Sequence, residues 1–240
     1  MPGTSSHLQI AIDGPAASGK TTVARRVAER LNVLYLDTGA MYRALAYAAL
    51  RTQTDLDNEN ALVRLFAQHR IHVTLDSRAP LGFHIYAGNR ELSQNDLESP
   101  EVTAVVSTIA AHARVREAMV EEQRRIAQAG PVVMAGRDIG TVVLPDAQVK
   151  IFLTASVQAR VQRRRAQLEE AGVDVSAHEL AKEIEERDRL DETRASSPLR
   201  KAADAIVIDS STLSVDDVVQ RIVDRSIAAP SGNAHVSSDV

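Results

Sequence analysis

Residues 8–31 of the chain read LQIAIDGPAASGKTTVARRVAERL, and this stretch decides the fold. The short apolar run at 8–12 predicts a buried strand, and the apolar residues of 21–31 fall on one face of a helix. Between them, residues 14–21 match the pattern G-x-x-x-x-G-K-[ST] at every specified position. Glycines let backbone N–H groups point at an anion, and a helix start adds a positive dipole end. We therefore expect a phosphate-binding loop.

This loop predicts binding of a nucleoside triphosphate and does not name what receives the phosphate. Lys20 would bring a mobile positive charge to the outer phosphates, and a hydroxyl of Thr21 or Thr22 would lie near Mg²⁺. The alternative is a glycine-rich turn with an incidental lysine, which the flanking strand and helix disfavour. The residues expected to bind the donor are Gly14, Pro15, Ala16, Ala17, Ser18, Gly19, Lys20, Thr21 and Thr22.

Composition excludes several other classes of protein. The 240 residues are 44% apolar and 25% charged, which suits one substantial domain or one domain that carries a large insert. A net charge of -4 and only 3% aromatic residues argue against nucleic-acid binding. No cysteine is present, so disulfides and thiolate metal sites are excluded. Without a signal-like start or a long apolar run, we expect a soluble cytoplasmic protein that binds no membrane.

Strands and helices alternate along most of the chain. Further strands are predicted at 33–36, 132–135, 149–153 and 205–208, and helices at 41–50, 156–171, 177–194 and 214–227. This alternation predicts an α/β fold with a doubly wound, five-stranded parallel sheet.

The stretch 53–129 interrupts that alternation. It contains an antiparallel ribbon at 71–75 and 83–87 and helices at 60–68, 101–112 and 115–129. We therefore predict a core from 8–52, 130–153 and 196–229, an inserted substrate domain at 53–129, and a helical lid with its flanking helices at 154–195. The ends, 1–7 and 230–240, have little to bury and are expected to be disordered.

Two motifs follow core strands, where an open parallel sheet binds its ligands. Thr38 and Arg43 lie beyond the second strand and can hold a second anion, although a capped helix start with a surface arginine is the alternative. Arg137 and Asp138 follow the third strand. There Arg137 can reach a phosphate and Asp138 can accept a hydrogen bond from an exocyclic amine, unless the two form a structural ion pair.

The two helices of the predicted lid carry arginines on single faces. Arg160, Arg163 and Arg164 are spaced i, i+3 and i+4, and Arg187, Asp191 and Arg194 are spaced i, i+4 and i+7. Phosphoryl transfer requires cations around the moving group and exclusion of water, which a closing arginine-bearing hairpin provides. The alternative is a solvated charged helix in which Glu185, Glu186 and Asp188 pair with some of these arginines.

Several motifs in order, GPAASGKT, LDTGAMYRA, RVREAM, AGRDIGTVVLPDA, ERDRLDETRASSPL and ADAIVIDSS, resemble the bacterial cytidylate kinase family. The resemblance spans about residues 10–227. It implies a nucleoside-monophosphate kinase of the P-loop type, with a parallel core, a lid and an enlarged monophosphate-binding domain. Such enzymes move the γ-phosphate of ATP to CMP or dCMP. Thr21 stands where many relatives carry glycine, so the threonine that meets Mg²⁺ stays open.

The resemblance also assigns residues. Arg160 and Arg163 look like lid arginines that contact ATP. The residues implied to bind the monophosphate substrate are Thr38, Tyr42, Arg43, Ser107, Arg116, Arg137, Asp138, Arg187, Asp191 and Arg194. Among these, Ser107, Arg116 and Asp138 match positions that contact cytosine in the family. The groups expected to take part in transfer are Lys20, Arg137, Asp138 and Arg187.

Other functions stay open on the sequence alone. One is a P-loop kinase that acts on another nucleoside monophosphate or a small metabolite, and a second is a nucleotide-gated binding protein without transfer. No oligomer face is evident, so we expect a monomer.

Overall fold

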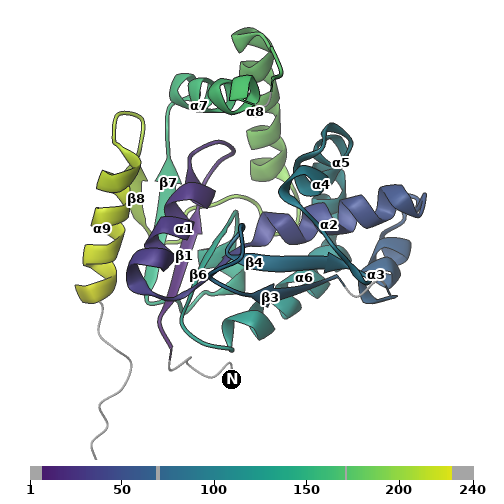
Figure 1. Ribbon diagram of the computed structural model, residues 1–240, viewed down its shortest axis with the longest axis horizontal. Coiled ribbons are helices and arrows are strands. Elements are labelled where there is room, and N and C mark those ends of the chain that lie inside the picture. Colours follow the sequence, from purple (N-terminus) through teal and green to yellow (C-terminus); the bar gives the residue numbers. More distant parts are fainter. Residues whose placement is uncertain (1–6, 69–70, 171, 229–240) are drawn as a thin grey trace, which may run out of the picture.

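The computed structural model describes residues 7–68, 71–170 and 172–228 (Figure 1). The terminal segments predicted to be disordered lie, apart from His7, outside the described residues.

A parallel sheet forms the centre of the molecule, with strand order β2-β6-β1-β7-β8. Its strands are β1 (Gln9–Asp13), β2 (Leu34–Asp37), β6 (Val132–Gly136), β7 (Val149–Thr154) and β8 (Ile206–Asp209). Every pairing is parallel, and Asp13 aligns with Gly136 at the carboxyl ends of β1 and β6. The predicted five-stranded sheet is confirmed, with each strand shifted by at most one residue at its start.

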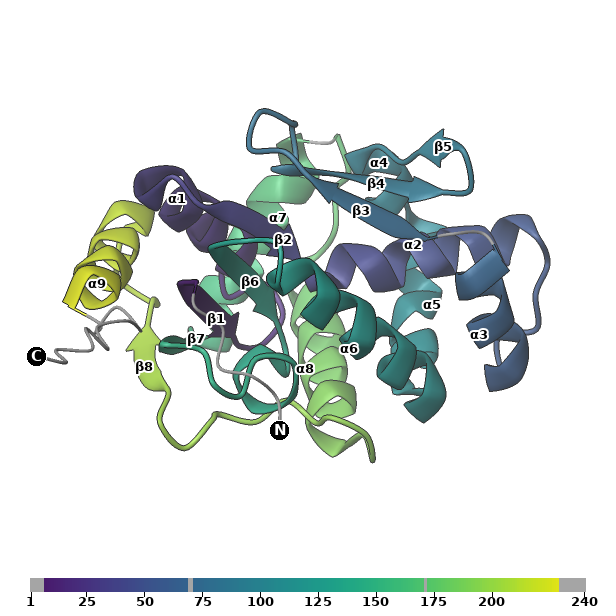
Figure 2. The ribbon, with the colours of Figure 1, turned by 90° about the horizontal axis from the view of Figure 1, so that it is seen from below.

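Helices cover both faces of this sheet, as apolar runs without alternation require. Figure 2 shows α1 (Lys20–Leu31) and α9 (Val215–Ala228) together on one face, and α6 (Ala113–Ala127) on the other side. The central strands β1 and β6 are buried along their whole length. One continuous apolar core therefore fixes the carboxyl ends of β1, β2 and β6 relative to one another.

The helix after β2 begins earlier than the sequence predicted. We predicted a helix at 41–50, but α2 (Thr38–Arg51) starts directly after β2. The Asp37 side chain caps this helix, because its Oδ1 accepts a hydrogen bond from the backbone N–H of Gly39 at 2.9 Å. The Asp37 carboxylate therefore caps the first turn of α2.

The segment between α2 and α6 packs beside the parallel sheet, and its buried apolar residues belong to the same core. An antiparallel sheet contains β3 (His72–Leu75), β4 (Phe83–Ala87) and β5 (Arg90–Glu91), which confirms the predicted ribbon and adds a short strand. Helices α3 (Glu59–Gln68) and α5 (Pro100–Ala111) were expected, but α4 (Gln94–Glu98) was not. Ser93 and Asp96 form a capping box at the start of α4. Because this helix has only five residues, it shows no clear helical periodicity in the sequence. Treating 53–129 as a separate inserted domain stays a prediction.

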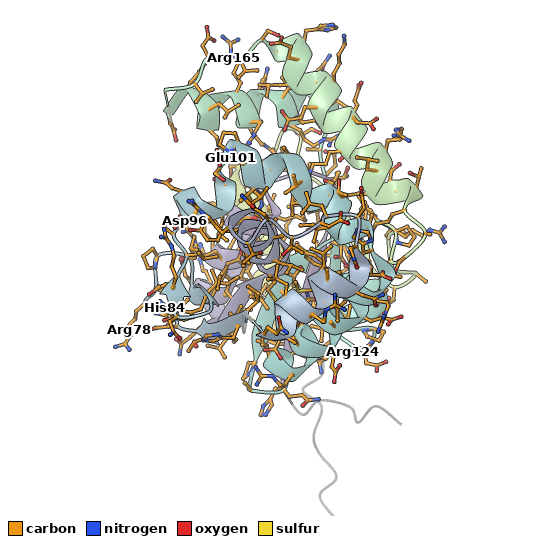
Figure 3. All side chains as sticks on the ribbon, turned by 90° about the vertical axis from the view of Figure 1, so that its right-hand side faces the viewer. Arg78, His84, Asp96, Glu101, Arg124 and Arg165 are labelled. Atoms are coloured by element: carbon orange, nitrogen blue, oxygen red, sulfur yellow. The ribbon has the colours of Figure 1, made fainter. Side chains whose placement is uncertain are left out.

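Helices α7 (Val157–Glu170) and α8 (Ala177–Thr193) rise from the sheet as a hairpin (Figure 1). Val161, Leu180 and Ile184 join them in a small apolar cluster, against which Ala17 of the phosphate loop packs. Arg165 points from α7 into solvent (Figure 3) and pairs with Glu169 at 2.8 Å. Arg165 thus marks the outer face of the hairpin.

Gly14 is a position where an added side chain would clash with the backbone of a neighbouring strand. Its φ is +153°, and a Cβ built there would lie 2.0 Å from the carbonyl oxygen of Leu153 in β7. We expect Gly14→Ala to lower the free energy of unfolding by at least about 3 kcal/mol, measured by urea denaturation. Gly172→Ala is the control, because Gly172 has φ +76° but nothing within 4 Å of an added Cβ. It should cost only about 1 kcal/mol, and equal losses in the two variants would contradict the clash.

Candidate active site

The phosphate loop connects β1 to α1 and wraps around its own lysine. Gly14, Ala17 and Gly19 take positive φ values of 153°, 56° and 90°, which turn successive backbone groups inward. The Lys20 ammonium donates hydrogen bonds to the carbonyl of Pro15 at 2.6 Å and to the hydroxyl of Ser18 at 3.4 Å. The loop therefore holds its cation in place through its own polar atoms.

Lys20 also interacts electrostatically with the residues that the sequence predicts to bind the acceptor. Burial lowers its pKa well below the usual value, the positive charge of Arg137 lowers it further, and Asp37 and Asp191 oppose this. Arg187 acts in the same direction as Arg137. The structure thus brings the loop lysine, the motif after β6 and helix α8 into one site, although they are far apart in sequence.

The first threonine of α1 contacts the cap of α2. The Thr21 hydroxyl donates to Oδ2 of Asp37 at 2.9 Å, while Oδ1 of the same carboxylate caps α2. Thr22 is half-buried on the same helix. A hydroxyl and a carboxylate oxygen side by side at a phosphate loop are ligands that suit Mg²⁺.

Three arginines from different elements meet on the acceptor side. Arg43 of α2 donates to the carbonyl of Leu97 at 2.9 Å and to the Thr103 hydroxyl at 3.0 Å. Arg137 donates to Asp191 at 2.6 Å. Arg187 has no hydrogen-bond or ion-pair partner among the residues that the structure describes, and burial together with Arg137 and Arg43 lowers its pKa to about 10. A half-buried guanidinium surrounded by like charges is a strong site for an added anion.

Asp138 lies next to this cluster, between two other arginines. Its carboxylate accepts from Arg116 at 2.5 Å and lies 4.0 Å from Arg194. Arg137 and Asp138 therefore do not pair with each other, and the alternative of a structural pair between them is wrong. Arg194 continues to Asp191 at 3.5 Å, which links the base-side and phosphate-side groups.

Several buried polar atoms around Asp138 lack a partner. The Arg116 guanidinium lies over the ring of Tyr42, 5.2 Å from its centroid. Burial raises the pKa of Tyr42 to about 12. The Tyr42 hydroxyl, Nε of Arg116, Nη2 of Arg194 and Nε2 of Gln123 are buried without a hydrogen bond inside the described part of the chain. Unsatisfied polar groups gathered in one place point to a polar ligand.

The remaining predicted substrate residues lie on the helices beside this cluster. The Thr38 hydroxyl is buried and donates to the carbonyl of Ala135 at 2.9 Å, so α2 is tied to the end of β6. Ser107 is half-buried on α5 and has no hydrogen bond within the described residues.

The arginines predicted for the lid reach the phosphate loop from α7. Arg160 donates from Nη1 to the carbonyl of Ala16 at 3.2 Å, and Arg163 donates from Nη1 to the carbonyl of Ser18 at 3.1 Å. Arg163 also bonds the hydroxyl and carbonyl of Ser210 at 3.1 and 2.5 Å. Both arginines therefore lie where donor phosphates are expected.

Two carboxylates that contact the candidate site were missed by the sequence analysis. Asp13 ends β1, and Asp188 was considered only as a solvated partner of surface arginines. Asp188 is 13% exposed and pairs with Arg160. Asp13 was detectable, because an ionisable residue at the end of a buried strand requires partners, the argument already applied to Asp138. Asp188 was not, since its helix carries many charges.

Asp13 joins the donor loop to the acceptor motif. Its two carboxylate oxygens accept from the backbone N–H groups of Ile139 and Gly140 at 2.8 and 2.7 Å. These residues start a π-helical turn, Ile139–Val143, directly after Asp138. Burial raises the pKa of Asp13 to about 6, although the two hydrogen bonds oppose this shift. The carboxylate fixes the acceptor motif to the strand that carries the loop.

This order of parallel strands, with a glycine-rich loop and lysine after the first strand, defines a P-loop phosphotransferase. The family model for cytidylate kinase matches residues 10–227. The chain is 49% identical over 219 residues to a cytidylate kinase from Geobacillus sp. (strain WCH70), with 91% of this chain and 96% of that protein covered. The cytidylate kinase from Enterococcus faecalis (strain ATCC 700802 / V583) is 48% identical, with 90% and 93% covered. The chain belongs to the cytidylate kinase family.

A solved structure shows the same fold at low sequence similarity. An uncharacterized protein from Eubacterium ventriosum ATCC 27560 superimposes with a TM-score of 0.50 at 14% identity, covering 92% of this chain and 99% of that one. At this identity the likeness concerns the fold alone.

The pKa of Asp13 predicts a pH dependence of stability. A carboxyl with a raised pKa binds its proton more tightly in the native state than in the unfolded chain, so ionisation lowers the free energy of unfolding. This contribution is fully present below the unfolded value of 3.8 and is lost as pH rises to about 6. The shift corresponds to about 3 kcal/mol.

Asp13→Asn cannot titrate and serves as the reference. The free energy of unfolding of the wild type should fall relative to the variant between about pH 4 and pH 7, by up to ~3 kcal/mol. Chemical denaturation at several pH values measures this difference. A difference that does not change with pH would contradict the raised pKa.

Proposed function

We propose that the protein transfers the γ-phosphoryl group of ATP to CMP, and to dCMP, forming ADP and the cytidine diphosphate. The observation that carries this proposal is the single site in which the loop lysine, Lys20, meets the acceptor arginines Arg137 and Arg187. One cationic site beside a phosphate loop suits two phosphate-bearing nucleotides placed end to end. Membership of the cytidylate kinase family supports cytosine as the acceptor base.

The acceptor phosphate would lie among Arg43, Arg137 and Arg187. Arg187 supplies an unpaired guanidinium, and Arg137 is held by Asp191, which keeps its orientation. The phosphate oxygens of the acceptor are already ionised, so no general base is required. Catalysis then consists of alignment of two phosphates and neutralisation of their charge.

The acceptor base would lie beside Asp138, near Tyr42, Ser107 and Arg116. Asp138 is buried and acts only as an acceptor when ionised, so it favours the amino group of cytosine over the carbonyl of uracil. A site with buried polar groups rejects a base that leaves them unpaired more strongly than an apolar pocket does.

The residues at the start of α1 fit a magnesium ion bound with ATP. Within the described residues, no cluster of three or more acidic or histidine side chains could hold a metal. Mg²⁺ commonly takes few protein ligands and keeps waters and phosphate oxygens. The hydroxyl of Thr21 or Thr22 would bind it, and Asp37 beside Thr21 would hold a bound water. The ion would neutralise charge on the donor phosphates.

Other predictions about the molecule's setting stay open. None of the helices formed by the described residues has the length and apolar character that crossing a membrane requires. Action as a monomer, a cytoplasmic location and no binding to nucleic acid stay predictions of the sequence. The alternative of another acceptor, a different nucleoside monophosphate or a small metabolite, has no observation in its favour.

Lys20→Met tests the donor site. The change removes the ammonium but keeps an unbranched chain of similar length, and we expect ADP release in the presence of CMP to fall by roughly 100-fold or more. A coupled assay measures the rate, and circular dichroism checks that the fold persists. Turnover near the wild-type rate would contradict a role for Lys20 in transfer.

Asp138→Asn tests base recognition with little change of shape. An amide can donate a hydrogen bond to the uracil carbonyl, so we expect the ratio of kcat/KM for CMP to that for UMP to fall by about tenfold or more. Parallel assays with both acceptors at saturating ATP give this ratio. An unchanged ratio, with both activities reduced alike, would remove Asp138 from base recognition.

A further inference from the structure

A carboxylate already occupies one backbone amide of the phosphate loop. Oδ1 of Asp188, on α8, accepts a hydrogen bond from the N–H of Ala16 at 3.2 Å. Its other oxygen pairs with Arg160 of α7. Arg160 in turn donates to the carbonyl of Ala16 at 3.2 Å. Both backbone groups of Ala16 are therefore bound by one ion pair from the lid hairpin.

This ion pair is largely withdrawn from water. The side chains of Arg160 and Asp188 are 7% and 13% exposed. Arg160 is also fixed by a bond from Nε to the carbonyl of Ala155 at 3.2 Å. Because both charged groups are desolvated, each is stabilised by the other and by the Ala16 backbone. A ligand that binds at Ala16 would therefore also change the contacts of α7 and α8.

The carboxylate occupies a backbone N–H group of the phosphate loop. The N–H groups of such a loop serve to bind anionic phosphate oxygens. Asp188 presents an anionic oxygen to one of them from within the protein. A donor triphosphate that enters the loop brings several negative charges close to this carboxylate, and at short range in a buried site like charges repel strongly.

We propose that Asp188 is a positioning residue that competes with donor phosphate for the loop. Its carboxylate holds Arg160 against Ala16 and takes the place of a phosphate oxygen at the Ala16 amide. Donor binding displaces the carboxylate and so releases the Arg160 guanidinium from its ion pair, and the guanidinium can then bind phosphate while Nε and Nη1 keep their contacts with the carbonyls of Ala155 and Ala16. The inference rests on the proposed donor site.

The test compares two variants that each remove one negative charge from α8. Asp188→Asn keeps the shape of the side chain and removes the competing charge. Glu185→Gln is the matched control, because Glu185 is exposed and has no bonded partner in the described residues. Isothermal titration calorimetry of each full-length protein with ATP and Mg²⁺, without acceptor, gives the dissociation constants.

We expect Asp188→Asn to bind ATP more tightly than the wild type, by about fivefold or more, and Glu185→Gln to bind it as the wild type does. A residue that only braces the lid would weaken binding when replaced. Unchanged or weaker binding in Asp188→Asn, with a wild type that binds ATP, would overturn the competition. A wild type that binds no ATP would instead overturn the proposed function.

A second measurement needs no variant. A structure of the wild type with a non-hydrolysable ATP analogue should place a phosphate oxygen at the Ala16 amide and Asp188 beyond hydrogen-bond distance from it. An Asp188 carboxylate that keeps its bond to Ala16 with the analogue in the loop would contradict the proposal.

Discussion

Repulsion among buried cations is the constraint on which the site depends. Lys20, Arg43, Arg137 and Arg187 lie near enough for burial and like charge to lower the pKa of three of them. Asp37 and Asp191 offset part of this charge. Such an arrangement is costly unless an anion completes it. In the proposed function, the phosphates of two nucleotides would supply that anion, so that unfavourable charge in the free protein would become favourable binding.

The core sheet makes this concentration of charge possible. β1, β2 and β6 end side by side, β1 and β2 each end in an aspartate that bonds a neighbouring segment, and β6 is bonded there through the carbonyl of Ala135. Asp13 holds the turn after β6, Asp37 caps α2 and bonds Thr21, and Thr38 bonds Ala135. The apolar core keeps the strands in register. These short polar contacts then hold the phosphate loop, the start of α2 and the turn after β6 at fixed distances from one another.

The hairpin of α7 and α8, predicted to be a lid, is part of this network. Arg160 and Arg163 contact the backbone of the loop, and Asp188 closes the same contact from α8. The outer face is different: Arg189, which was not among the arginines of the predicted faces, pairs with Glu186 at 2.6 Å in an exposed position. The same helix therefore carries half-buried charges that face the proposed site and exposed ion pairs on its outer face.

The sequence by itself determined the elements and the loop. Apolar runs and glycine positions are local signals, so the order of strands and helices, the phosphate loop and the arginine-bearing faces could be predicted. The short helix α4 was missed, and α2 was predicted to start too late although a capped helix start was one alternative, because a capping side chain is recognised only when its backbone partner is known.

Only the tertiary structure decided which charged side chains form ion pairs with each other. Asp138 pairs with Arg116 instead of its neighbour Arg137, Arg137 pairs with Asp191, and Arg160 pairs with Asp188. The partners lie between 22 and 54 residues apart, so no local pattern specifies them. Their choice follows from burial, since a charge withdrawn from water must take the nearest opposite charge that the packed core brings within reach.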